Sequence, residues 1–261
     1  MRTSHNRLLL LLSVLLALFP FGHAQVRESE TGAPGPVKAQ HLTAELISET
    51  GTITPGGRSR VALALTLEPG RHVYWVYAGD SGEPPTVKWS VPAGFSVGQM
   101  QYAVPSRLPL GPLMDYGYEG KAVFPFDLST SAQTPLGIAD MRAHVQWLVC
   151  REVCLPGKAY LDLNLKVVPQ ASSDTNKLID AAVHSEPVKP PTSVKIVVTA
   201  TRGTLTLNVV TGKKEFSAEY YPLDDDSIRN AARRCRASPS AENRSSARSN
   251  PQPGTDTCLD P

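Results

Sequence analysis

The sequence predicts an all-β protein whose main domain, residues 37–168, folds as an antiparallel β-sandwich of immunoglobulin-like type. Two observations indicate this. About eight short segments rich in β-branched and aromatic residues recur between turn signals, and none of them shows a helical period. The 23 prolines and 19 glycines are scattered along the chain, where they mark turns. A domain of about 130 residues is long enough to bury one core.

The expected strands follow one another through short connections. They are residues 37–48, 60–67, 72–77, 86–91, 95–102, 122–128, 141–149 and 159–168. Turn signals rich in proline and glycine separate them, as at residues 54–57 and 92–94. Residues 105–120 show no regular pattern, and we expect an irregular connection there. The three tryptophans are expected core residues, because aromatic side chains bury large areas and favour strands.

The N-terminal residues 1–24 are typical of a secretory signal peptide. Arg2 and Arg7 give a basic N-terminal region before the apolar run 8–19, which is short for a membrane span. Small residues at 22 and 24 suit cleavage after Ala24. The alternative is an uncleaved membrane anchor. Export places the cysteines in a compartment where disulfides can form and persist.

Composition and motifs argue against several function classes. The formal net charge of +2 gives no reason to expect a nucleic-acid partner. The chain has no phosphate-binding glycine loop, no HExxH and no GxSxG. Its six histidines are spread out without the spacing of metal ligands, so we expect no metal centre.

The stretch 147–156 organises the chain, because it carries Cys150 and Cys154 between two strand-like segments. Residues 141–149 are mostly apolar, and residues 160–167 alternate apolar and polar side chains. This pattern predicts a hairpin with the cysteines at its tip. Cross-strand Cβ atoms lie about 4.5–5.5 Å apart there, which is near enough for a disulfide after a small adjustment.

Such a disulfide would contribute little to the stability of the fold. In the chain-entropy model, a ring of about five residues restricts the unfolded chain by only about 2 kcal/mol. A short ring at an exposed tip favours a labile, exchanging bond, so redox exchange is the leading interpretation. A minor structural bridge, a pair that never oxidises and a metal pair remain alternatives, although C-x3-C alone supplies only two ligands.

Several nearby residues could act on the pair. Arg151 next to Cys150 would favour a thiolate, and Glu152 would oppose it. His144 lies on the strand that leads to Cys150 and could tune the thiolate, or it could be a packed or surface residue. Residues 113–120 carry Tyr116 and Tyr118 among glycines. They form either a mobile flap over the hairpin or two surface tyrosines folded against the core.

Three motifs together support a more specific hypothesis: GDSGEPP at 79–85, DYGYEG at 115–120 and WLVCREVCLP at 147–156. In this order they resemble the N-terminal periplasmic domain of DsbD-type thiol:disulfide interchange proteins, especially the longer ScsB-like members. The resemblance covers residues 37–168. It implies an immunoglobulin-like fold in which Cys150 and Cys154 are the exchanging pair. Better-known members have a longer spacing between the two cysteines than this chain.

The resemblance also implies a function. Members accept electrons from a membrane-embedded cysteine domain and pass them to periplasmic disulfide proteins. This chain would then be a periplasmic monomer with protein-disulfide reductase activity and a link to cytochrome c biogenesis. Its partners would be a membrane-embedded thiol donor and periplasmic thioredoxin-fold proteins, and no cofactor is needed. Tyr116 and Tyr118 would correspond to the cap loop over the pair.

A second hypothesis comes from a different class of protein. ScsB-like relatives are associated with copper tolerance, and Cys150, Cys154, Met100 and Met114 are soft ligands. The chain could therefore be a non-catalytic periplasmic binding module.

The remaining segments complete the expected organisation. Residues 25–36 form a linker, 169–192 a linker with a short helix, 193–223 a partial second β-domain, and 224–261 a disordered or aberrant tail. The helix, residues 176–184, would be capped by Asp174 or Thr175.

The last two segments also carry specific expectations. The partial domain would contain a hairpin of 193–200 with 203–210, then a strand at 216–221. The tail has too few apolar residues to offset the entropy of ordering, and its Cys235 and Cys258 are expected to be incidental. A third interpretation is that the chain is a truncated or frameshifted fragment without function.

Overall fold

A computed structural model describes residues 34–201, 204–213, 219–224, 228–232, 234–235 and 243–248. The expected signal peptide, most of the first linker and much of the expected tail lie outside these residues. Among the described residues, no helix is both long and apolar enough to cross a membrane.

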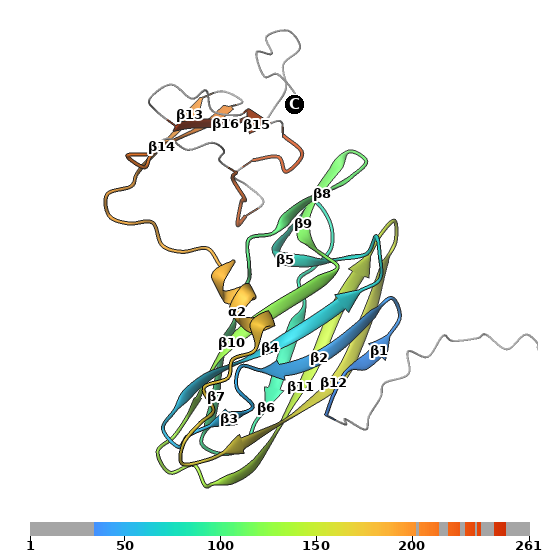
Figure 1. Ribbon diagram of the computed structural model, residues 1–261. Coiled ribbons are helices and arrows are strands. Elements are labelled where there is room, and N and C mark those ends of the chain that lie inside the picture. Colours follow the sequence, from blue (N-terminus) through green and yellow to red (C-terminus); the bar gives the residue numbers. More distant parts are fainter. Residues whose placement is uncertain are drawn as a thin grey trace, which may run out of the picture.

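Two β-sheets form the main body, as the sequence predicts (Figure 1). The first contains, in spatial order, β1 (Val37–Ala39), β2 (Leu42–Ser48), β4 (Arg58–Leu67), β10 (Lys121–Thr130) and β7 (Phe95–Met100). The second contains β3 (Thr52–Ile53), β12 (Cys154–Val167), β11 (Gly137–Cys150), β5 (His72–Gly79), β9 (Leu113–Glu119) and β8 (Ser106–Leu110). Strand β6 (Thr86–Ser90) also pairs with β11. All these pairings are antiparallel except that of β3 with β12.

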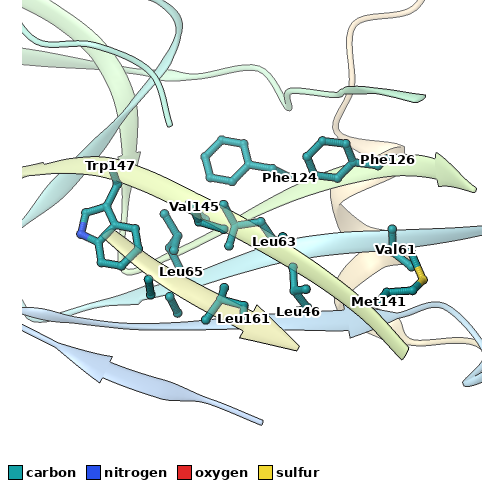
Figure 2. Packing of buried hydrophobic residues seen from close by; sticks show 14 of the residues in the cluster. Leu46, Val61, Leu63, Leu65, Phe124, Phe126, Met141, Val145, Trp147 and Leu161 are labelled. Atoms are coloured by element: carbon teal, nitrogen blue, oxygen red, sulfur yellow. The ribbon is translucent and has the colours of Figure 1, made fainter. Parts of the chain in front are cut away.

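The core lies between the two sheets (Figure 2). Alternation sends every second side chain of a strand inward, so Leu161 on β12 and Leu65 on β4 are fully buried. Trp147 is a core residue, as expected, with 4% of its surface exposed. Figure 2 shows it at one end of the cluster, beside Leu65 and Leu161.

Helix α2 (Lys177–His184) packs against β10 and β4. The sequence placed this helix correctly but its cap wrongly. Asn176 is the N-cap, because its extended backbone lets its side chain accept a hydrogen bond from the Leu178 amide. The hydroxyl of Thr175 instead donates to Asp180 at 2.7 Å.

The expected irregular connection 105–120 is wrong, because β8 and β9 form a regular hairpin there. Leu110 pairs with Leu113 across a two-residue turn whose first residue, Gly111, has φ +57°. Glycine at this position is typical of a tight hairpin turn of the primed type. Pro109 fits because β8 is an edge strand, where a missing N–H donor is tolerated.

A separate sheet lies beyond α2. Strands β13 (Lys195–Thr201) and β14 (Thr204–Val210) pair as an antiparallel hairpin, where the sequence predicts one. Strand β16 (Asn243–Arg248) pairs with β14, and β15 (Arg234–Cys235) pairs with β16. These two strands fall within the segment that composition alone led us to expect as a tail.

Candidate functional site

The cysteine pair lies at the tip of the β11–β12 hairpin, as predicted. The two strands pair residue by residue up to Cys150 and Cys154, and a disulfide joins these two residues. Their Cα atoms are 4.1 Å apart, with Arg151, Glu152 and Val153 between them. The strand pairing therefore holds the two sulfurs together before any bond forms between them.

The disulfide lies on the face of the sheet that points away from the main core. Side chains alternate along β11, so Cys150 is on the opposite face from Val149 and Trp147. Cys150 instead packs in a small cluster with Tyr74 and Ala78. Leu148 and Cys154 are partly buried members of the same cluster. Only 1% of Cys150 is exposed, whereas Cys154 is partly exposed, so Cys154 is the more accessible residue of the pair.

Tyr74 on β5 contacts the sulfur of Cys154. Its phenol oxygen lies 3.3 Å from Sγ of Cys154. A sulfur within a disulfide carries no proton, so the phenol is the donor. The Nε2 atom of His72 is 3.4 Å from the same phenol oxygen, and the two rings meet edge to face at 5.2 Å. His72 is itself buried and pairs with Cys150 in the backbone register of β5 and β11.

Burial sets the protonation of both rings. It lowers the pKa of His72, although the carboxylates of Asp115 and Glu119 oppose that shift. Burial also raises the pKa of Tyr74; a side-chain interaction with Ser81 opposes this shift, and the carboxylate of Asp115 reinforces it. At neutral pH His72 is therefore neutral, and Tyr74 keeps the proton that it donates to sulfur.

The loop 79–85 packs on the ring of Tyr74. Gly82 has φ +80°, and a Cβ at this position would lie 2.1 Å from the Tyr74 ring, so glycine is required there. Asp115 on β9 is completely buried and holds the loop. Its carboxylate accepts hydrogen bonds from the backbone N–H of Ser81 at 2.9 Å and from the Ser81 hydroxyl at 2.7 Å.

Tyr116 and Tyr118 lie in strand β9 rather than in a loop, because β9 pairs with β5 and β8 on its two sides. The ring of Tyr116 is buried against Trp75 and Tyr77, with centroid separations of 6.5 and 6.0 Å. The expectation of a loop at residues 113–120 is therefore wrong. A role for these residues as cover for the pair stays a prediction.

Tyr118 packs on the main core. Its hydroxyl donates to the carbonyl of Ala103 at 2.7 Å, and its ring meets Phe124 edge to face. Burial raises the pKa of the Tyr118 phenol.

The three predicted tuning residues lie at different distances from the pair. Arg151 and Glu152 are exposed at the hairpin tip, and the Arg151 guanidinium lies beside Gly70. His144 stacks on Tyr160 at 4.8 Å. It is six residues along β11 from Cys150, which in extended backbone is about 20 Å. Solvent ions largely screen a charge at that distance, so the geometry does not favour direct tuning by His144.

The residues proposed for a soft metal are spread out. Met100 ends β7 and packs against the main core, and Met114 lies on β9 opposite Pro109. Within the described part of the chain, no three His, Cys, Asp or Glu side chains gather to hold a metal ion.

Sequence reasoning missed four residues of the site, namely His72, Tyr74, Ser81 and Asp115. One available signal was the spacing of His72 and Tyr74, since residues two apart in a strand share a face. Another was that Ser81 and Asp115 lie inside two of the motifs used for the resemblance.

A groove of about 310 Å³ lies beside the hairpin stem. Its lining includes Leu148 and Pro156. These two residues pair with each other across the hairpin, and each lies two residues along its strand from a cysteine. Trp147, Pro84, Glu83 and Lys158 also line it. The groove therefore reaches to within two residues of the cysteine pair along each strand.

Comparison with known proteins agrees with the geometry. Residues 43–166 match the family described as thiol:disulfide interchange protein DsbD, N-terminal. No curated protein matches the sequence significantly.

Among solved structures, the N-terminal periplasmic domain of ScsB from Proteus mirabilis is similar, with a TM-score of 0.59 and 18% identity. The similarity covers 82% of each chain.

Two cohesins are much less similar. One, in a type I cohesin–dockerin complex from Clostridium thermocellum, has a TM-score of 0.27 and 11% identity over 48% of this chain and 99% of that chain. The seventh ScaB type I cohesin of Pseudobacteroides cellulosolvens has a TM-score of 0.27 and 9% identity over 51% and 97%. These scores carry no argument about the fold.

The family match contains the whole hairpin, the Tyr74 strand and the loop that packs on it, and the ScsB likeness supports the same fold. Residues 43–166 therefore form a domain of the DsbD N-terminal family of thiol:disulfide interchange proteins.

Proposed function

We propose that the protein is a periplasmic thiol–disulfide exchange module that passes reducing equivalents through Cys150 and Cys154. One observation carries the proposal. A disulfide lies at a hairpin tip between a buried residue, Cys150, and a partly exposed one, Cys154, whose sulfur accepts a hydrogen bond from Tyr74. Such an arrangement separates an attacking cysteine from a resolving cysteine.

The first step of exchange uses the accessible sulfur. In the reduced protein, the Cys154 thiolate attacks one sulfur of a partner disulfide. A bond forms between Cys154 and that sulfur, the partner disulfide breaks, and the second partner sulfur leaves as a thiolate that takes up a proton. Tyr74 stabilises the thiolate before attack by donating a hydrogen bond to it.

The second step uses the buried sulfur. The Cys150 thiol loses its proton and attacks Sγ of Cys154, so that the Cys150–Cys154 bond forms and the mixed disulfide breaks. The released partner sulfur takes up a proton. In total, two electrons and two protons pass to the partner, which leaves as a dithiol. The pairing of β11 with β12 keeps Cys150 within reach throughout.

The partners follow from the chemistry and from the family. A membrane-embedded dithiol protein would reduce the Cys150–Cys154 disulfide again, and periplasmic thioredoxin-fold disulfides would receive the electrons. The chain acts as a monomer and needs no cofactor, because the electrons move between sulfur atoms. The groove lined by Leu148 and Pro156, two residues along the strands from the cysteines, would receive a segment of the partner.

The test is the reduction potential of the pair. The protein with Cys235→Ser and Cys258→Ser, which leave the pair as the only cysteines, is equilibrated in glutathione or dithiothreitol buffers, and free thiols are trapped and counted. We expect a reversible two-electron transition between about −120 and −270 mV, the range of known exchange proteins. A pair that stays oxidised well below about −300 mV would be a structural bridge, and the proposal would fail.

A further inference from the structure

A segment outside the family match packs on the same end of the domain as the disulfide. We call residues 219–224 and 228–232 the C-terminal segment. Its Tyr221 ring meets Trp75 edge to face at 6.1 Å and Tyr116 at 5.7 Å. Ile228 and Ala232 are buried, with 4% and 7% of their surfaces exposed. The segment is therefore part of the packed structure around β5 and β9.

Asn230 makes the polar contacts of this segment. It is buried, with 4% of its surface exposed. Its Nδ2 amide donates to the hydroxyl of Tyr77 at 2.9 Å and to Oδ1 of Asp80 at 2.8 Å. Its backbone carbonyl accepts longer hydrogen bonds, both 3.5 Å, from the Tyr116 hydroxyl and the Arg107 guanidinium. A buried amide with a charged acceptor fixes the position of that acceptor.

The acceptor, Asp80, begins the loop that packs on Tyr74. Its second carboxylate oxygen, Oδ2, accepts from the Met114 amide at 2.7 Å, and its own N–H donates to the Met114 carbonyl at 3.1 Å. Asp80 is thus held by β9 on one side and by Asn230 on the other. The next two residues are Ser81, which Asp115 holds, and Gly82, which lies on the Tyr74 ring.

We propose that Asn230 is a positioning residue for the Cys150–Cys154 pair. It acts through Asp80 on the loop 79–85, and through that loop on Tyr74, which touches the Cys154 sulfur. The proposal rests on the proposed function for its effect on exchange. It assigns a role in the redox site to the chain beyond the matched residues 43–166.

Exchanging the side chains of Asp80 and Asn230 tests the positioning role directly. In Asp80→Asn, the new NH₂ group must face either the Asn230 amide or the Met114 N–H, and both are donors. In Asn230→Asp, two carboxylates face each other. The double variant restores a donor at one position and an acceptor at the other with the original net charge. The carbonyl at position 80 still accepts from Met114, and the Tyr77 hydroxyl turns to donate to position 230.

Two readouts follow the loop and the site separately. The first is hydrogen–deuterium exchange of the Ser81 amide, and the second is the rate at which dithiothreitol reduces the disulfide. We expect each single variant to accelerate both by about tenfold, as the loss of a hydrogen bond to a charged group predicts. The double variant should return both to within about twofold of the original protein, because the effects of two contacting residues are not additive.

The chain offers a matched control. Asn164 donates a hydrogen bond to Asp140 at the far end of the same hairpin, on exposed surface. Asp140→Asn, Asn164→Asp and their double variant should leave both readouts unchanged.

The outcomes separate the two proposals. Single variants at positions 80 and 230 that match the original protein overturn the positioning role. The role is also overturned if the single variants accelerate both readouts and the double variant does not return them to the original values. The hydrogen bond between positions 80 and 230 would then not be what positions the pair. If a single variant fails to fold, the double variant still tests the positioning role. The proposal requires the double variant to fold and to show the same two rates as the original protein. An original protein whose disulfide resists thiols overturns the redox function alone, because Ser81 still reports the state of the loop.

Discussion

The phenol oxygen of Tyr74 lies 3.3 Å from Sγ of Cys154, although the two residues are 80 positions apart in the sequence. This contact gives the sulfur a hydrogen-bond donor in an otherwise largely apolar cluster. In such surroundings a thiolate depends on the few donors that reach it.

Tyr74→Phe removes this donor while keeping the ring that Gly82 packs on. We expect the reduced protein to react about tenfold more slowly with iodoacetamide at pH 7, because a hydrogen bond to a charged group contributes roughly 1.5–3 kcal/mol. Tyr160→Phe removes a phenol from the same sheet next to His144 and should not change the rate. Equal rates for the two variants would refute the role of Tyr74.

Exposure of the sulfurs predicts different behaviour for single cysteine variants. Cys150→Ser leaves the accessible sulfur, so the protein should form a stable mixed disulfide with oxidised glutathione. Cys154→Ser leaves only the buried sulfur, 1% of whose residue is exposed, and should react at least about tenfold more slowly. Mass spectrometry in the Cys235→Ser, Cys258→Ser background measures both adducts. The reverse order of rates would assign attack to Cys150.

Position 82 requires glycine for two reasons: its φ is positive, and a Cβ there would clash with the Tyr74 ring. Gly82→Ala should lower the free energy of unfolding by more than Gly111→Ala, because both have positive φ but only position 82 meets the Tyr74 ring. The conformational part is about 1–2 kcal/mol for each. Urea unfolding of both variants measures the difference. The expectation fails if the two alanine variants lose the same amount.

Stability should depend on pH through His72. Its pKa is lowered in the folded protein from 6.5, mainly by burial. The unfolded chain therefore binds more protons as the pH falls through 6.5, and the folded state loses stability toward its own lower pKa. In His72→Gln, the free energy of unfolding should fall less between pH 7.5 and pH 5 than in the original protein. Urea unfolding at each pH measures this difference. An unchanged slope would mean that His72 titrates alike in both states.

The core predicts a conventional packing effect. Leu161 is fully buried between the sheets, whereas 58% of Leu136 is exposed. Leu161→Ala should cost about 2–5 kcal/mol, and Leu136→Ala about 0.5 kcal/mol or less. Thermal and urea unfolding check both values. A small loss for Leu161→Ala would mean that the core relaxes around the missing side chain.

Local pattern was enough to predict the sandwich and the cysteine hairpin. Alternation in 160–167, the apolar run before Cys150 and the three-residue gap between the cysteines all describe one neighbourhood of the chain. The β8–β9 hairpin was missed because residues 105–120 show no regular alternation of apolar and polar side chains. Its pairing depends on an edge position that sequence does not reveal.

The contacts around the pair could not be predicted, because they join distant segments. Asp115 meets Ser81 across 34 positions, and Asn230 meets Asp80 across 150. The low apolar content of residues 224–261 also led to the expectation of a tail without packed structure. The expected tail has few apolar residues, yet Ile228 and Ala232 are buried there, and Asn230 holds the segment by hydrogen bonds to Tyr77 and Asp80.

The disulfide sits outside the main core, across β11 from Trp147 and Val149, at the end of a ladder that already joins its two strands. Breaking the bond releases a ring of only a few residues and leaves the sandwich intact. Oxidised and reduced forms should therefore share one architecture, and electrons can enter and leave without a refolding step. A partner must then tell the two forms apart by the chemistry of the Cys154 sulfur rather than by a change of shape.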